Sequence, residues 1–199
     1  MREDVPVTMH KVIAGAVFAC ALAMTTGSAA DDPAWPALRD GARVVLLRHA
    51  ATSGGAGDPE GFRLEDCATQ RNLTEKGRAD AKAIGERIRA QKVPVGKVLS
   101  SQWCRCRDTA ALMALGPVEV AETFNNAYTL GGRRDELSKG ARAVIAGWKG
   151  PGILMVVTHG ANILPLTGFQ PAEGEMVIVE PEAIADGKVR VIGRIPAGS

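Results

Sequence analysis

The stretch VVLLRHAAT, residues 44–52, places an arginine and a histidine directly after a run of four apolar residues. The surrounding segment ARVVLLR, residues 42–48, is typical of a short buried strand, since it follows Gly41 and leads into a segment rich in small residues and glycine. A cation and an imidazole at the end of a buried strand need a compensating partner. We therefore expect other polar groups to lie close to Arg48 and His49.

Apolar strands alternate with amphipathic helices along the chain. Strands are expected at residues 42–48, 97–101, 118–121, 153–158, 175–180 and 188–195. Helices are expected after the capping residue Thr74, at residues 104–115, around residues 137–148, and from Ala161 to near Gly168. Residues 31–41 are interpreted as a leader, and residues 53–61 and 122–133 as loops. Central strands that are apolar throughout predict a three-layer α/β/α sandwich with a mainly parallel sheet.

The first thirty residues are predicted to be an export signal. A charged start precedes the apolar run VIAGAVFACALAM, residues 12–24, and small residues follow it up to Ala30. The run is short for a membrane span, so an uncleaved anchor and lipid attachment at Cys20 are the weaker alternatives. The mature protein, residues 31–199, is then a single domain that is periplasmic or secreted, with no stable membrane insertion.

Composition excludes some classes of partner. The formal net charge is +2, and it is unchanged without residues 1–30, which hold two basic and two acidic side chains. This balance does not favour nucleic acid or a membrane surface as a partner. Any attraction for anions must come from a local cluster, and the sequence leaves the oligomeric state open.

The mature chain retains Cys67, Cys104 and Cys106. In an oxidising compartment two of them should form a disulfide. Because Cys104 and Cys106 are close in sequence, we expect Cys67 to pair with one of them. The segment GFRLEDCATQR, residues 61–71, would then be tied next to Arg105 as a wall of the pocket, or simply be stabilised.

Polar side chains follow three of the predicted strands. Arg48 ends the first predicted strand and His49 follows it. Ser101 ends the second, and Arg105 comes one helical turn later. His159 follows the strand at residues 153–158. In open α/β sheets, ligands bind beyond the carboxyl ends of the strands. Two guanidiniums there can each hold the oxygens of a phosphate, helped by the helix N-termini that follow the strands. The sequence therefore predicts a site for a small phosphorylated substrate.

An imidazole beside such a site can act as a nucleophile. The neutral ring of His49 can attack phosphorus and form a phosphohistidine, while neighbouring arginines disfavour its protonated form. The arginines also offset charge on the transferring group, and His159 can donate a hydrogen bond to it. No metal or other cofactor is expected, because the sequence lacks a carboxylate-rich cluster and a set of metal ligands.

These motifs also carry a family resemblance. The chain resembles the histidine phosphatase superfamily, with the phosphoglycerate-mutase-like fold, in LLRHA, RNLTEKGRADA, SSQWCRCRDTA and VVTHGANI, at residues 46–50, 71–81, 100–110 and 156–163. Ala50 stands where the family has glycine. The resemblance implies that His49 is the phosphorylated nucleophile and that Arg48, Arg105 and His159 form the phosphate pocket.

The general acid of the family does not carry over. Asn125 and Asn126 stand where many members have a glutamate. Glu175, at the start of a late strand, is the predicted catalytic acid. The other candidates are Glu122, Asp58 and Asp66. An enzyme that lacks the acid would act best on substrates with good leaving groups, such as phosphoramidates, acyl phosphates or anhydrides.

The sequence thus predicts a metal-independent phosphatase of the cell envelope that hydrolyses phosphate esters or related phosphoryl compounds through phosphohistidine. One alternative is a phosphomutase of the same fold, which needs a second position for the product and usually a glutamate acid. The other is a non-catalytic phosphate-binding protein. The loops at residues 53–70 and 122–135 are expected to set specificity, and the identity of the substrate stays open.

Overall fold

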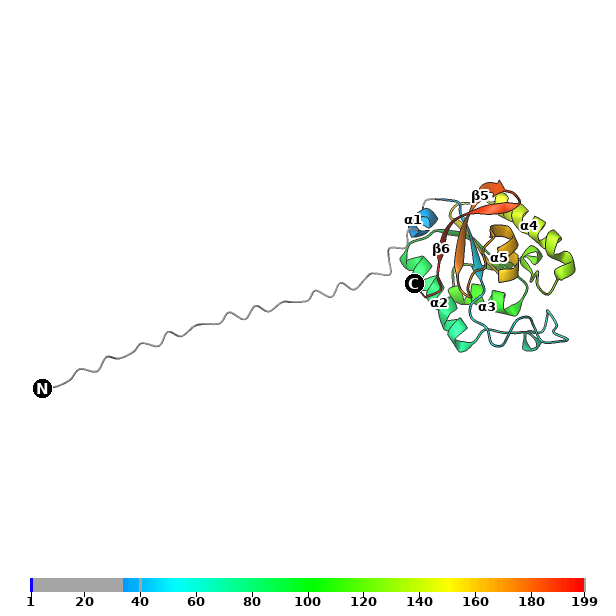
Figure 1. Ribbon diagram of the computed structural model, residues 1–199, viewed down its shortest axis with the longest axis horizontal. Coiled ribbons are helices and arrows are strands. Elements are labelled where there is room, and N and C mark those ends of the chain that lie inside the picture. Colours follow the sequence, from blue (N-terminus) through cyan, green and yellow to red (C-terminus); the bar gives the residue numbers. More distant parts are fainter. Residues whose placement is uncertain (2–33, 40, 199) are drawn as a thin grey trace.

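The computed structural model describes residue 1, residues 34–39 and residues 41–198 (Figure 1). Apart from Met1, the predicted signal and Cys20 lie outside the described residues. No helix in the described part of the chain is long and apolar enough to cross a membrane.

A six-stranded sheet forms the centre of the fold, in the order β3-β2-β4-β1-β5-β6. The strands are β1 (Val44–Arg48), β2 (Val95–Ser100), β3 (Val118–Val120), β4 (Ile153–Thr158), β5 (Met176–Ala185) and β6 (Lys188–Ile195). The first four strands pair in parallel, whereas β5 runs antiparallel to both β1 and β6. The prediction of an α/β fold with a mainly parallel central sheet is confirmed.

Helices cover both faces of this sheet (Figure 1). The helices are α1 (Ala34–Arg39), α2 (Glu75–Ala90), α3 (Cys104–Met113), α4 (Arg134–Ala146) and α5 (Gly160–Thr167). Alternate residues of β1 explain the two layers: Val45 and Leu47 pack in one core with the first three helices, and Val44 and Leu46 pack in the other with α4 and α5. The period of two along a strand divides its side chains between the two faces.

The structure differs from the sequence-based expectation at two segments. Residues 31–41 are more than a leader, because α1 buries Trp35 and Leu38 in the core. The segment at residues 122–133 contains two short 3₁₀ turns, η2 (Glu122–Phe124) and η3 (Gly131–Arg133). Single apolar side chains in short segments give no periodicity, so pattern analysis has little to act on there.

A disulfide joins Cys67 to Cys104, and Cys106 is a buried free thiol. The predicted pairing of Cys67 is thus assigned to the first of its two candidate partners. The bond links the 3₁₀ turn η1 (Cys67–Thr69) to the first residue of α3. It fastens the loop after β1 to the helix that carries Arg105.

Breaking this bond is expected to weaken the fold. The bond closes a loop with a sequence separation of 37, so replacing both Cys67 and Cys104 by serine should lower the free energy of unfolding by about 2–4 kcal/mol. Urea denaturation of the variant and the wild type measures this difference. As a control, reduction should raise the count of free thiols in the denatured protein by two, and an unchanged count would mean that the bond does not form.

Candidate active site

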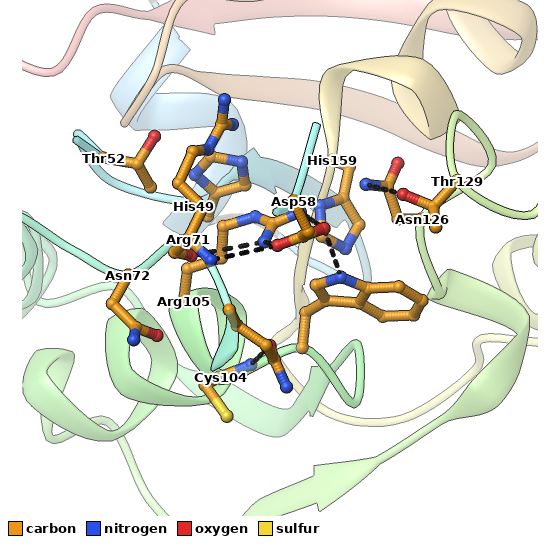
Figure 2. Close-up of polar contacts among 12 residues, drawn as sticks. His49, Thr52, Asp58, Arg71, Asn72, Cys104, Arg105, Asn126, Thr129 and His159 are labelled. Atoms are coloured by element: carbon orange, nitrogen blue, oxygen red, sulfur yellow. Dashed lines mark hydrogen bonds and ion pairs between the residues drawn. The ribbon is translucent and has the colours of Figure 1, made fainter. Parts of the chain in front are cut away.

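The carboxyl ends of β1, β2 and β4 meet at one cavity of about 740 Å³. Backbone hydrogen bonds hold these ends together: the His49 amide donates to the Thr158 carbonyl at 3.0 Å, and the Ser101 amide donates to the Val157 carbonyl at 3.0 Å. The cavity is lined by all four residues that the sequence places in the phosphate pocket, namely Arg48, His49, Arg105 and His159. Figure 2 shows His49, Arg105 and His159 directed towards one region between these strand ends.

His49 is held in the form that a nucleophile needs. Its ring is buried, and Nδ1 lies 3.0 Å from the carbonyl oxygen of Ala50. A carbonyl only accepts hydrogen bonds, so Nδ1 carries the proton and Nε2 keeps its lone pair. Burial, together with the charges of Arg105, Arg48 and Arg71, lowers the pKa of His49 to about 3 despite that hydrogen bond. The imidazole is therefore neutral at physiological pH.

The backbone after His49 is fixed from two sides. The Ala50 amide donates to the hydroxyl of Thr109 on α3 at 3.1 Å. The Ala51 carbonyl accepts from the amide of Thr74, the residue that caps α2, at 3.0 Å. A Cβ on Gly77 would lie 2.0 Å from that same carbonyl oxygen, so only glycine lets α2 approach so closely. Both helices thus orient the carbonyl that sets the tautomer of His49.

His159 faces His49 across the cavity, with ring centroids 5.5 Å apart. Its Nε2 lies 3.0 Å from the Ser101 hydroxyl, and the Trp103 ring packs edge-on against it. The Cys106 thiol lies 3.5 Å from the same nitrogen, and burial raises the pKa of this thiol to about 12. Burial, followed by the charges of His49 and Arg105, holds the pKa of His159 well below its usual value. A neutral ring is the result here too.

Three guanidiniums line the cavity beside the two imidazoles. Arg48 donates to the Pro171 carbonyl at 2.9 Å, and Arg105 forms a buried ion pair with Asp58. Arg71 has no carboxylate within ion-pair distance among the residues that the structure describes. Burial and the charge of Arg105 lower the pKa of Arg71.

This combination of groups is suited to a tetrahedral oxyanion. Guanidiniums present flat pairs of N–H donors that match phosphate oxygens. Gly160 and Ala161, at the N-terminus of α5, also line the cavity, and a helix N-terminus favours anions. The other helix N-terminus that we expected at the site, that of α3, is occupied, because the Cys104 amide donates to the Gln70 side chain at 3.0 Å.

Comparison with known proteins agrees with this geometry. Residues 44–129 match the model of the histidine phosphatase superfamily (branch 1). The matched segment contains Arg48, His49 and Arg105, and the structure adds His159 to them. The chain thus resembles the histidine phosphatase superfamily over residues 44–129.

Solved structures share the fold of this chain at low sequence identity. The protein histidine phosphatase SixA complexed with tungstate has a TM-score of 0.55 at 18% identity, over 78% of this chain and 97% of that one. The product of open reading frame Rv3214 from Mycobacterium tuberculosis gives 0.57 at 17% identity, over 78% and 98%. The mycobacterial glucosyl-3-phosphoglycerate phosphatase Rv2419c gives 0.53 at 18%, over 76% and 97%. No curated protein matches the sequence.

The predicted general acid, Glu175, is not brought to the cavity. Its carboxylate is buried, accepts from the Ala172 amide at 2.8 Å and forms an ion pair with Arg194 at 2.6 Å. Only its backbone carbonyl approaches the site, as an acceptor for the amide of Arg48 at 3.2 Å. The ion pair with Arg194 turns the side chain to another part of the structure, so Glu175 has no position from which to protonate a leaving group.

The other carboxylate candidates also fail to line the cavity. Asp66 caps η1 and pairs with Arg63 on the surface. Glu122 starts the η2 turn, and Asp58 is held against Arg105.

Asn125 and Asn126 occupy the position where the family places its acid. Asn125 is buried, and its side-chain oxygen accepts from the Gln102 amide at 2.9 Å and from Ser101. Asn126 lines the cavity, where its side-chain nitrogen donates to the Thr129 hydroxyl at 3.1 Å (Figure 2). Neither amide can supply a proton as an acid does.

Sequence reasoning did not name several polar residues that line the cavity, among them Arg71, Thr52 and Glu173. Arg71 lies beside His49 (Figure 2). Glu173 accepts from the Thr52 hydroxyl at 2.8 Å and faces Arg48 at 3.6 Å. All three lie in loops, where no periodicity marks a side chain as inward. The one available signal was that Arg71 lies three residues before Thr74, the cap of α2, within a motif that the resemblance already contained.

The neutral histidines should make stability depend on pH. The pKa of His49 is about 3 in the native state, below its usual value, so an unfolded chain binds a proton that the native chain does not. Relative to a His49→Gln variant, the wild type should lose about 1.4 kcal/mol of unfolding free energy per pH unit as the pH falls below about 6.5. Urea denaturation between about pH 7 and pH 4 measures this. A difference that stays constant with pH would show that His49 keeps an ordinary pKa.

Proposed function

We propose that this protein is a phosphatase that transfers the phosphoryl group of its substrate to His49 and then to water. The observation that carries the proposal is the neutral His49 ring, with its Nε2 lone pair left free, in a cavity shared with three arginines and a second imidazole. A nucleophile of this kind needs both an available lone pair and cations around the group it attacks. Phosphatase activity also fits the resemblance to the superfamily.

The transfer proceeds in two displacements. Nε2 of His49 bonds to phosphorus while the bond to the leaving group breaks, and the leaving group departs with the electron pair. The Nδ1 proton stays on the ring, where the Ala50 carbonyl stabilises the positive charge. Water then attacks phosphorus, the P–N bond returns its electron pair to the ring, and dihydrogen phosphate leaves with both protons of the water.

The arginines supply the electrostatic part of catalysis. Charge spreads over the three equatorial oxygens during phosphoryl transfer, and the guanidiniums of Arg48, Arg71 and Arg105 line the cavity that would hold those oxygens. Arg48 and Arg105 are fixed in place by a carbonyl and a carboxylate partner before a substrate arrives. Such preorganised charges lower the barrier because they need no reorganisation during the reaction.

The proposal extends to where the protein acts and what it acts on. The sequence of residues 1–30 and the disulfide support export to the periplasm or beyond it. Cell fractionation with a terminal tag checks this, and a cytosolic product would contradict it. The cavity is larger than a phosphate needs, and two exposed apolar side chains, Tyr128 and Leu164, line it. The substrate is therefore a small phosphorylated molecule whose leaving group contacts this rim.

The central test measures turnover and phosphoenzyme formation in variants of His49 and Arg105. Incubation with an aryl phosphate in the presence of a chelator should give turnover and an acid-labile phosphoenzyme in the wild type. His49→Ala should abolish both, and Arg105→Ala should lower kcat by roughly 10²–10³-fold, because it removes a contact to the transferring oxygens. Turnover that survives in His49→Ala would contradict the proposal. Phosphate binding without any turnover would favour a non-catalytic binding protein.

The carboxylates near the cavity predict a preference for good leaving groups. Glu173, the carboxylate that lines the cavity, accepts two hydrogen bonds from Thr52 and faces Arg48, which are contacts of an ion rather than of a proton donor. General acid catalysis typically raises a reaction rate by roughly 10²–10⁴-fold. Because no acid assists the leaving group here, kcat/KM should be lower by roughly 10-fold or more for phenyl phosphate than for 4-nitrophenyl phosphate, which has the better leaving group.

A matched variant separates the two roles of Glu173. Glu173→Gln retains the size of the side chain and removes its ability to deliver a proton. If Glu173 is not the acid, this variant should change kcat for both aryl phosphates by the same factor. A selective loss on phenyl phosphate would show that Glu173 protonates the leaving group and would contradict the preference predicted above.

A further inference from the structure

The most deeply buried ion pair in the described part of the chain joins Asp58 to Arg105, whose side chains are each 1% exposed. The Asp58 carboxylate accepts from Arg105 Nη1 at 2.6 Å and Nη2 at 3.3 Å. It also accepts from Trp103 Nε1 at 2.9 Å and from the backbone amide of Arg71 at 3.1 Å. Buried charges are tolerated when their hydrogen-bonding capacity is filled, and four donors fill that of this carboxylate.

The N–H donors of the Arg105 guanidinium do not all have acceptors among the described residues. A guanidinium has five N–H groups. Nη1 and Nη2 both donate to Asp58, and Nη1 also reaches the Arg71 carbonyl at 3.3 Å. Nε is buried and has no partner among the described residues. Asp58 is thus the carboxylate that holds the Arg105 guanidinium beside the cavity that Arg105 lines, among the residues that the structure describes.

The same carboxylate also anchors a loop. Gly54, Gly55, Ala56 and Gly57 precede Asp58 and line the cavity. Glycines carry no side chain to hold such a loop in place, and the carboxylate contacts of Asp58 attach its end to α3 (Figure 2). The position of Arg105 and the position of this loop therefore depend on one side chain.

We propose that Asp58 is a positioning residue of the phosphoryl-transfer site, which fixes the orientation of the Arg105 guanidinium at the cavity. This inference rests on the proposed function. Burial alone would raise the pKa of Asp58, but the hydrogen bonds from Arg105 and Trp103 outweigh it and keep the pKa below its usual value. Asp58 thus acts through Arg105 as a carboxylate and is not the missing acid.

A double-mutant cycle tests whether Asp58 acts through Arg105. Asp58→Asn is nearly the same size and should lower kcat by roughly 10–100-fold while KM changes by less than about 3-fold, because the lost alignment matters most in the transition state. In an Arg105→Ala background, Asp58→Asn should have no further effect on kcat. A merely structural role would lower activity by the same factor in both backgrounds, and that result would overturn the proposal.

Two further variants complete the experiment. Glu60→Gln, an exposed carboxylate of the same loop, should leave kcat and KM unchanged. If Asp58→Asn does not fold, Trp103→Phe removes one donor from the carboxylate and keeps an aromatic ring. It should lower kcat by roughly 2–5-fold in the wild type and not at all beside Arg105→Ala, because this contact, too, acts through Asp58 and Arg105. An equal loss in both backgrounds would again count against Asp58 as a positioning residue.

The cycle also separates this proposal from the proposed function. If the wild type shows no turnover, the proposed function fails, and the same cycle is then measured on the affinity for inorganic phosphate. Weaker binding by Asp58→Asn that disappears in the Arg105→Ala background would still support Asp58 as the residue that aligns Arg105. Equal losses of affinity in both backgrounds would overturn it.

Discussion

The register between β1 and β4 determines where the chemistry of this protein can occur. In the parallel pairing, Arg48 lies beside Thr158, so the residues that follow, His49 and His159, leave the sheet at the same point. The pairing of Ser100 with Val157 brings β2 to that edge as well, and α3 then presents Arg105. A shift of the pairing by one residue would move the side chains of a strand from one face of the sheet to the other. Such a shift would disrupt both packed cores, so the packing of the cores fixes the geometry of the site.

Burial then gives the cluster its electrostatic character. Cations and imidazoles gather at one cavity, and the buried imidazoles stay neutral. The charges that persist are those of arginine, which does not deprotonate in proteins. One of them is balanced by Asp58, another faces Glu173, and Arg71 has no ion-pair partner within the described residues. The site is thus prepared for an anion and keeps a nucleophile in its reactive form.

Much of the fold could be predicted from local patterns. Apolar strands such as residues 153–158 and the capped helix α2 carry their periodicity in the sequence, and their arrangement follows from the rules of parallel sheets. The four pocket residues could be predicted from their places at the strand ends. Arg48 ends β1 and His49 follows it, His159 follows β4, and Arg105 lies in the first turn of α3, which comes after β2. The helix α1 could not, because its three buried residues, Ala34, Trp35 and Leu38, form no repeated pattern.

The remaining parts of the site depend on loops that return to it from elsewhere. Arg71 and Glu173 reach the cavity, and the Asp58 carboxylate reaches Arg105 beside it, through turns and long-range contacts that no local pattern records. Glu175 is the opposite case, a residue that the sequence placed at the site and that the structure turns away from it. Its place at the start of β5 suggested the site, but an ion pair with Arg194 on the neighbouring strand β6 decides its direction. Side-chain partners of this kind become visible only in three dimensions.

The protonation state of His49 is the central claim, and nitrogen NMR of the histidine side chains tests it most directly. With His49→Gln used to assign its signals, the account predicts a neutral ring at about pH 6, below the usual histidine pKa of about 6.5, with the proton on Nδ1 and none on Nε2. A charged ring at that pH, or a proton on Nε2, would leave no lone pair facing the cavity and would contradict the account.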